Sequence, residues 1–162
     1  MSFLVKVRIG KISWLIGTFM LVIGLPCISL LSPRIFLNSS ASMPKGVYIK
    51  KSSNKLEIGD IIIFKINAKK GNLLKYVAGR EGDEYCFDFR GTLWINGSFA
   101  ASKNIRKYNE EVSNQSKCEI LKKGIWLVLG EHPDSYDSRY FGPISSAQII
   151  AQVELAWRIG QH

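Results

Sequence analysis

Charged residues are missing from one stretch near the start of this 162-residue chain, and acidic residues are missing from a longer one. No charge occurs between Lys11 and Arg34, and no acidic residue occurs before Glu57. Within that stretch the run Ile12–Leu31 is apolar, and as a helix it would span about 30 Å, enough to cross the hydrocarbon core of a bilayer. The sequence therefore predicts a transmembrane anchor.

The charges before this run predict its direction in the membrane. Three basic residues precede it, Lys6, Arg8 and Lys11, and basic residues favour the cytoplasmic side. We therefore expect residues 1–34 to form a cytoplasmic tip and anchor, and residues 35–162 to form an extracytoplasmic domain. A removable signal peptide, cut near Ser39 and Ala41, is the alternative, although the apolar region of such a peptide is shorter, about 7–15 residues.

Cysteine is scarce, with three residues in the chain. Cys27 lies in the apolar run, whereas Cys86 and Cys118 lie in the part expected outside the cytoplasm, where disulfides form and persist. We therefore predict a Cys86–Cys118 disulfide. Two buried thiols are the alternative.

Histidine is scarcer still, because the chain has only His132 and the terminal His162. A histidine-based serine hydrolase would have to use His132, near Asp134 and several serines, but the GxSxG motif of one large hydrolase class is absent. Nothing resembles a zinc-ligand cluster or a phosphate-binding loop. We expect no metal and no cofactor.

The chain carries a net charge of +9. A basic domain beside a membrane favours anionic lipid as a partner. The lysines are scattered and no basic stripe is visible, which argues against nucleic-acid binding.

Beyond the anchor, short apolar runs separated by turn residues predict an all-β domain, with no sustained helical period. The expected strands are Val47–Lys50, Asp60–Phe64, Leu73–Val77, Glu84–Phe87, Thr92–Ile95, Ile125–Leu129 and Ile149–Trp157. Asn96-Gly97 predicts a hairpin turn, because both positions of such a turn need positive φ. Residues Ala101–Lys123 are polar and lysine-rich, and we expect a long excursion between strands there.

Three segments carry residues that could support chemistry. NSSASMPKG, at 38–46, places three serines just beyond the anchor, although serines are also common filler in such loops. NLLKYVAGREGDEY places Lys75 in an apolar run, where burial would lower its pKa so that it could accept a proton. The alternative is a lysine exposed on an edge strand.

The third segment, GEHPDSYDSRYFGPI at 130–144, follows a clear strand. Loops that a rigid scaffold positions often carry function. Asp137 and Arg139 could form an ion pair there, while Ser135 or Ser138 could direct a hydroxyl at a neighbour. A solvated turn is the alternative.

In this order, SMPKG, GDIIIF, LKYVAGREGD and DSYDSRYFG resemble the sequence boxes of bacterial type I signal peptidases, and the resemblance covers Ser39–Gly142. The Met43-Pro44 pair, the short chain and the FGP ending at Pro143 are most similar to the conjugative-transfer subgroup called TraF, which processes pilin precursors. Two positions depart from the pattern: Tyr76 replaces a basic residue and Glu81 a proline.

The resemblance implies a signal-peptidase-like antiparallel β domain with a Ser-Lys dyad, in which Ser42 is the nucleophile and Lys75 the general base. It also implies that Ser40 and the Ser42 amide form the oxyanion hole. The supporting residues would be Ser135, which would orient the lysine, and the Asp137–Arg139 ion pair beneath the site.

The implied activity is that of a serine endopeptidase in the bacterial inner membrane, single-pass and with its catalytic domain on the periplasmic side. Its partners would be precursors with signal peptides, among them pilin, and inner-membrane lipid. The leading alternative is a non-catalytic single-span β-domain scaffold of an envelope or secretion assembly.

Overall fold

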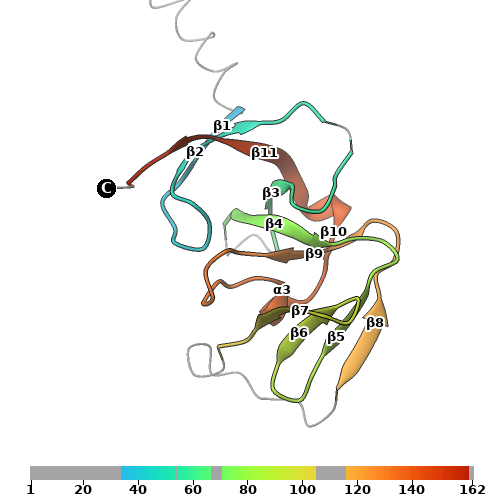
Figure 1. The fold of residues 1–162 in the computed structure, drawn as a ribbon. Helices are drawn as coiled ribbons and strands as arrows, with labels where there is room; N and C mark the ends of the chain where they lie inside the picture. Colours follow the sequence, from blue (N-terminus) through green and yellow to red (C-terminus); the bar gives the residue numbers. More distant parts are fainter. Residues whose placement is uncertain (1–33, 54, 67–70, 105–115, 161–162) are drawn as a thin grey trace, which may run out of the picture. The chain divides into compact units, whose positions relative to one another are not determined.

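The computed structural model describes residues 34–53, 55–66, 71–104 and 116–160, and Phe36–His162 belong to one compact unit. This unit is built mainly from antiparallel strands in two sheets, one of seven strands and one of four (Figure 1). The expected class, a mainly β antiparallel domain, is confirmed.

The seven-stranded sheet has the order β1-β2-β11-β3-β4-β9-β10. Its strands are β1 (Ile35–Asn38), β2 (Gly46–Lys50), β3 (Ile61–Phe64), β4 (Leu73–Gly79), β9 (Ile125–Leu129), β10 (Ile144–Ser145) and β11 (Ile149–Arg158). The long β11 pairs with both β2 and β3, and so joins the first strands to the centre of the sheet.

The four-stranded sheet has the order β7-β6-β5-β8. Its strands are β5 (Glu84–Phe87), β6 (Thr92–Ile95), β7 (Ser98–Ser102) and β8 (Lys117–Ile120). The predicted hairpin turn joins β6 to β7, and Asn96 and Gly97 both have positive φ, 50° and 73°. Two short helices, α3 (Ser138–Phe141) and η2 (Ser146–Gln148), flank β10.

Each of the seven predicted strands is present, within a few residues of its predicted bounds. The expectation for Ala101–Lys123 was wrong in part, because β7 continues to Ser102 and Lys117–Ile120 form β8. All four residues of β8 are exposed, so its sequence shows no apolar alternation. It pairs with β5 at the edge of the small sheet.

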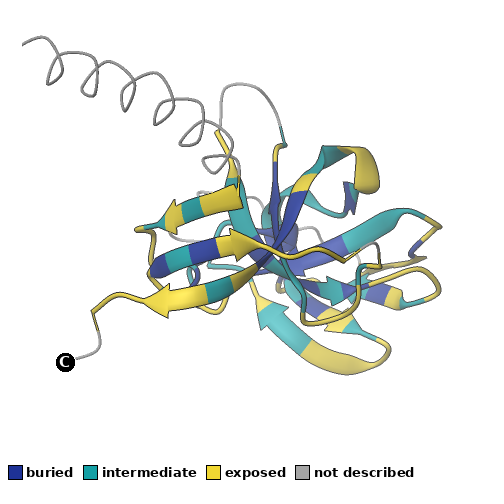
Figure 2. Ribbon diagram, turned by 90° about the horizontal axis from the view of Figure 1, so that it is seen from above, coloured by how far each residue is buried: buried dark blue, intermediate teal, exposed yellow. Residues whose placement is uncertain are grey.

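Buried residues concentrate in the middle of the unit, whereas turns, the end of β11 and the edge strand β8 are exposed (Figure 2). One cluster contains Ile62, Phe64, Val77, Val128 and Ile144 and packs on one face of the large sheet. A second contains Tyr85, Leu93, Leu121, Leu127 and Leu129, which come from both sheets or the turn between them. The small sheet therefore shares a core with the large one.

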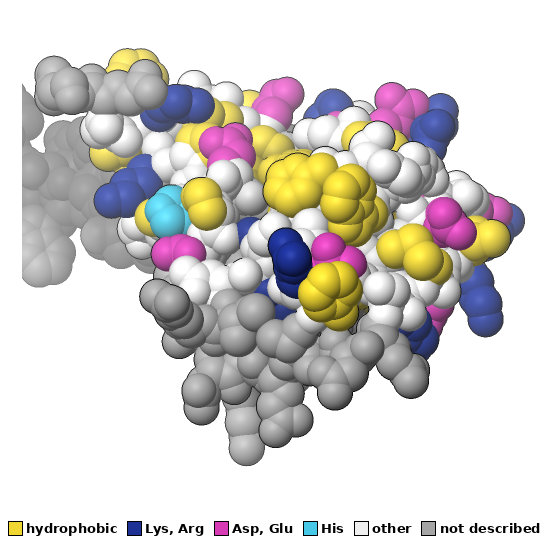
Figure 3. Space-filling model, turned by 60° about the horizontal axis from the view of Figure 1, so that its bottom comes forward, with side chains coloured by type: hydrophobic (Ala, Val, Ile, Leu, Met, Phe, Trp, Pro, Cys, Tyr) yellow, Lys and Arg dark blue, Asp and Glu magenta, His cyan; other side chains and the backbone are white. Residues whose placement is uncertain are grey.

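Some large apolar side chains reach the surface, and Figure 3 shows hydrophobic side chains among charged ones on one face. On the β6–β7 hairpin, Trp94 and Phe99 meet edge to face with ring centroids 6.0 Å apart. Both rings are exposed. The hairpin thus presents an aromatic pair to its surroundings.

The predicted transmembrane run, Ile12–Leu31, lies outside the described residues. Among the residues that are described, no helix is long and apolar enough to cross a bilayer.

Candidate active site

The loop between β1 and β2 and the centre of the large sheet meet at one pair of side chains. Ser42 lies in this loop, and Lys75 lies in β4, opposite Ile62 of β3. The Nζ of Lys75 lies 2.8 Å from Oγ of Ser42 and also donates to the backbone oxygen of Leu74 at 3.0 Å. The fold therefore brings together two residues that are 33 positions apart in the sequence.

Lys75 is buried because of the alternation of its strand. Lys75 and Val77 of β4 point to one buried face, where Val77 packs in the apolar cluster, and only 3% of Lys75 is exposed. Burial lowers the pKa of Lys75 from 10.5 to about 8, while the nearby Asp137 carboxylate opposes the shift and Arg139 adds to it. About a tenth of this amine is therefore uncharged at pH 7, compared with a negligible fraction for an ordinary lysine.

The serine loop is held from two sides. The carbonyl of Ser42 accepts hydrogen bonds from the backbone amides of Glu131 (2.9 Å) and His132 (3.5 Å). On the other side, Oγ of Ser40 lies 3.1 Å from Oγ of Ser42. The nucleophile predicted from the sequence thus has a hydroxyl and an amine as neighbours. Of the two, the amine can take the Ser42 proton when it is uncharged.

Asp137 and Arg139 form a buried ion pair beneath this site. Arg139 donates from Nε to Oδ1 at 2.8 Å and from Nη2 to Oδ2 at 2.7 Å. Asp137 also accepts from the amide of Gly130 at 2.9 Å, and its side chain caps α3. The remaining Arg139 donors bind backbone oxygens, among them those of Ser102 and Ser135. This pair therefore ties the 130–142 loop to the end of β7.

Ser135 is buried next to the loop, but its hydroxyl makes no hydrogen bond to Lys75. Among the described residues, Oγ of Ser135 has no hydrogen-bond partner. Gly130 allows the serine loop and the 130–142 loop to come close together, because a Cβ at this position would collide with Oγ of Ser135 and with the carbonyl oxygen of Ser42. Sequence reasoning missed Gly130; its only signal was a glycine directly after a buried strand.

Asn38 was also missed. Its side chain bonds to the backbone of Ser40, Met43 and Pro44, and so spans the serine loop. The signal that could have found it is an asparagine two residues before a serine, a spacing that favours an Asx turn.

Ser138 and His132 lie apart from the proton-transfer pair. The hydroxyl of Ser138 accepts from the amide of Val128, so it fixes the loop to β9. The Nδ1 of His132 accepts from the amide of Asp134 at 3.1 Å. The His132 imidazole has no hydrogen bond to a serine hydroxyl among the described residues, so the histidine-based alternative has no geometric support.

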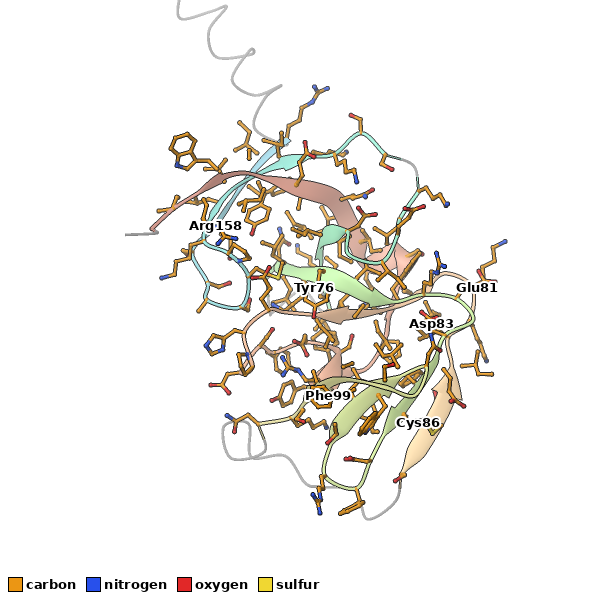
Figure 4. All side chains as sticks on the ribbon, in the orientation of Figure 1. Tyr76, Glu81, Asp83, Cys86, Phe99 and Arg158 are labelled. Carbon is orange, nitrogen blue, oxygen red and sulfur yellow. A yellow bond between two sulfur atoms is a disulfide. The ribbon has the colours of Figure 1, made fainter. Side chains whose placement is uncertain are left out.

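Four further residues singled out in the sequence are Cys86, Cys118, Tyr76 and Glu81, of which Figure 4 labels Cys86, Tyr76 and Glu81. Cys86 of β5 and Cys118 of β8 form a disulfide across the small sheet. Tyr76, which replaces a basic residue, packs against the core shared by the two sheets. Glu81 is exposed in the turn after β4. The two positions that depart from the resemblance therefore lie in the shared core and in a turn, and the Ser42–Lys75 contact is present beside them.

Comparison with known proteins identifies the family. A sequence model of the family described as "Signal peptidase, peptidase S26" matches residues 9–158. This match covers most of the chain, so the chain belongs to the signal peptidase family, peptidase S26.

Individual proteins that are similar to it include two signal peptidases I. A signal peptidase I from Bacillus caldolyticus is 29% identical over 113 residues, which are 60% of this chain and 59% of that protein. The chain thus matches less than two thirds of the length of this curated relative. A crystal structure of a signal peptidase I from Enterococcus faecalis is 25% identical, covers 64% of this chain and 100% of that one, and has a TM-score of 0.43.

Proposed function

We propose that this chain is a membrane-bound serine endopeptidase that cleaves signal peptides from exported precursors with a Ser42–Lys75 dyad. The observation that carries the proposal is the 2.8 Å contact between the Ser42 hydroxyl and the amine of a lysine that is 3% exposed. A serine hydroxyl becomes a good nucleophile when a base takes its proton, and an amine can do so only when it is uncharged. Burial lowers the pKa of Lys75 to about 8 and so raises the fraction of its amine that is uncharged.

The reaction follows from these two groups. Ser42 Oγ attacks the carbonyl carbon of the scissile peptide bond while its proton passes to Nζ of Lys75. The resulting oxyanion collapses, the C–N bond breaks, and Lys75 returns the proton to the leaving amine. A water molecule that loses its proton to Lys75 then attacks the acyl-enzyme, and the released Ser42 oxygen takes the proton back.

The other predicted residues have supporting roles. Ser40 and the Ser42 amide would stabilise the oxyanion, and Oγ of Ser40 lies 3.1 Å from Oγ of Ser42, near the atom that attacks. Ser135 would orient the lysine amine once the site is occupied, as its unsatisfied hydroxyl allows. The Asp137–Arg139 pair holds the loop that contains Ser135.

We assign residues 1–34 to a cytoplasmic tip and single transmembrane anchor, and residues 35–162 to a periplasmic catalytic domain in a bacterial inner membrane. The charge-free run Ile12–Leu31 supports the anchor. A tether raises the effective concentration of the enzyme at the membrane surface, where precursors emerge. The enzyme therefore needs no large binding interface.

Lipid is the second proposed partner, and exposed apolar residues support it. Trp157 of β11, 71% exposed, lies opposite Val47 of β2, and Ile49 follows on the same face of β2. The next residue, Arg158, is also exposed (Figure 4), but strand alternation places it on the opposite face of β11 from Trp157. Trp157→Glu should slow precursor processing in proteoliposomes but not in detergent. If the variant and the wild type process precursor at the same rate in proteoliposomes, lipid contact by Trp157 is refuted.

We propose a pilin-like conjugative-transfer precursor as the substrate, on the strength of the similarity to the TraF subgroup. The test is to co-express the enzyme with pilin-like precursors and to measure the product masses. Shortened products should appear with the wild type and be absent with Ser42→Ala. Hydrolysed and cyclised products differ by one water, so the same masses establish how the acyl-enzyme is resolved.

A non-catalytic scaffold would give the opposite result in this test. Every precursor would keep its full mass with the wild type, and Ser42→Ala would change nothing. Ser39→Ala is the matched control, because Ser39 is an exposed serine of the same loop.

A further inference from the structure

The side-chain amide of Asn38 lies at the centre of the loop that carries Ser42. Its Oδ1 accepts from the backbone amide of Ser40 at 3.1 Å and from the Ser40 hydroxyl at 2.8 Å. Its Nδ2 donates to the backbone oxygens of Met43 and Pro44, each at 3.0 Å, and to that of Ser40 at 3.2 Å. One side chain thus contacts the backbone on both sides of the nucleophile.

These partners fix the orientation of the Asn38 amide. A backbone N–H can only donate and a carbonyl can only accept, so Oδ1 must face Ser40 N and Nδ2 must face the two carbonyls. A flipped amide would lose these bonds. Asparagine satisfies the whole set because it carries a donor and an acceptor on one short side chain, whereas aspartate has no donor and leucine has neither.

The same bonds determine where the Ser40 hydroxyl lies. Because an amide oxygen only accepts, the short contact to Asn38 is a bond that Ser40 donates. Oγ of Ser40 is thereby held 3.1 Å from Oγ of Ser42, which in turn contacts Lys75. Four polar groups therefore form one hydrogen-bonded chain from the lysine amine to the Asn38 carbonyl oxygen.

The carbonyl end of the loop is anchored separately. The oxygen of Pro44 accepts from Asn38 and also from the hydroxyl of Tyr48 at 2.8 Å, and Tyr48 is completely buried. The Met43 side chain is also buried. Asn38 therefore connects the exposed Ser40 to the anchored Met43-Pro44 end of the loop. No other described side chain bonds to both Ser40 and Pro44.

We infer that Asn38 is a positioning residue, which holds Oγ of Ser40 and the Ser42 backbone in place, so that Ser40 can stabilise the oxyanion once its O–H turns from Oδ1 of Asn38 to the substrate oxygen. This inference rests on the proposed function. Asn38 does not touch the reacting atoms; it acts through Ser40 and through the closed shape of the loop. Loss of Asn38 should therefore impair the chemical step more than substrate binding.

The test compares the full-length wild type, Asn38→Leu, Ser40→Ala and the double variant in detergent micelles. The substrate is an internally quenched peptide with alanine before the scissile bond. Asn38→Leu should lower kcat about 10- to 100-fold and change KM less than about threefold, since a misplaced oxyanion donor affects mainly the transition state. Ser39→Ala is the matched control and should cleave at the wild-type rate.

The double variant separates positioning from a general structural effect. If Asn38 works through Ser40, most of the loss caused by Asn38→Leu should disappear when Ser40 is already alanine. Unchanged kcat in Asn38→Leu, or fully additive losses in the double variant, would overturn the inference while leaving the dyad intact. If the wild type cleaves neither this peptide nor the co-expressed precursors, the proposed function fails, and this inference fails with it.

Discussion

Arg139 and Asp137 form a two-pronged ion pair in which 3% of the Arg139 side chain and none of the Asp137 side chain is exposed. The pair is only two residues apart in the sequence, yet the arginine reaches four other backbone oxygens, those of Ser102, His132, Pro133 and Ser135. Because both charges are buried, each is stabilised by the other, and removal of either would leave an unpaired buried charge. The loop beneath the candidate site is therefore rigid only while both are present.

Removal of one partner should destabilise the protein strongly. Arg139→Leu leaves a buried carboxylate without its counter-charge, which costs about 3–5 kcal/mol. Thermal unfolding followed by circular dichroism should show a Tm lower by roughly 10 °C. The matched control is Arg80→Leu, at an exposed arginine, which should change Tm little. Equal effects of the two substitutions would contradict a structural role for the ion pair.

Activity should depend on pH through Lys75. The pKa of Lys75 is lowered to about 8, chiefly by burial, and only the uncharged amine can take the Ser42 proton. We expect kcat/KM for the quenched peptide to level off above about pH 8 and to fall about tenfold per unit below it. A profile that stays flat down to pH 6 would be inconsistent with lysine as the base.

The same lowered pKa should reduce stability. Between about pH 8 and 10.5 the unfolded chain binds a proton that folded Lys75 does not, so the contribution of this residue to folding improves as pH rises through that window. Below pH 8 the cost is about 3 kcal/mol. Lys75→Met should therefore raise Tm at pH 6.5, and by less at pH 9.5. Thermal unfolding at both pH values checks this, and an equal change in Tm at the two would argue against it.

The disulfide should stabilise the small sheet without serving the dyad. Cys86 and Cys118 are 32 residues apart, and closing such a loop stabilises a protein by about 3–4 kcal/mol. A variant with both cysteines changed to serine should unfold at lower denaturant concentration, yet cleave the quenched peptide at nearly the wild-type rate below its transition. A catalytic loss without a stability loss would mean that β8 has a role at the site.

The apolar content of short runs was sufficient to predict strands that bury one or both faces, such as β3, β4 and β9. It was not sufficient for β8, whose four residues are all exposed and whose pairing depends on β5. Apolar patterns mark buried positions, so a strand whose residues are all exposed shows no such pattern in its sequence.

The candidate site shows the same limit. An apolar run around Lys75 predicted its burial, and the family resemblance directed attention to Ser42. Asn38 and Gly130 were missed, because their contacts are mainly with backbone atoms: Asn38 binds the backbone of Ser40, Met43 and Pro44, and Gly130 leaves room for the Ser42 carbonyl. Such contacts depend on loop conformation, which side-chain chemistry alone does not reveal.

The most direct test of the Ser42–Lys75 dyad is the rate at which Lys75→Met cleaves the quenched peptide at pH 8. The wild type and Lys55→Met, an exposed lysine paired with Glu57, provide the reference rates. We expect Lys55→Met to retain the wild-type rate and Lys75→Met to lose about 10³-fold or more while remaining folded. Cleavage by folded Lys75→Met at the wild-type rate would contradict the account.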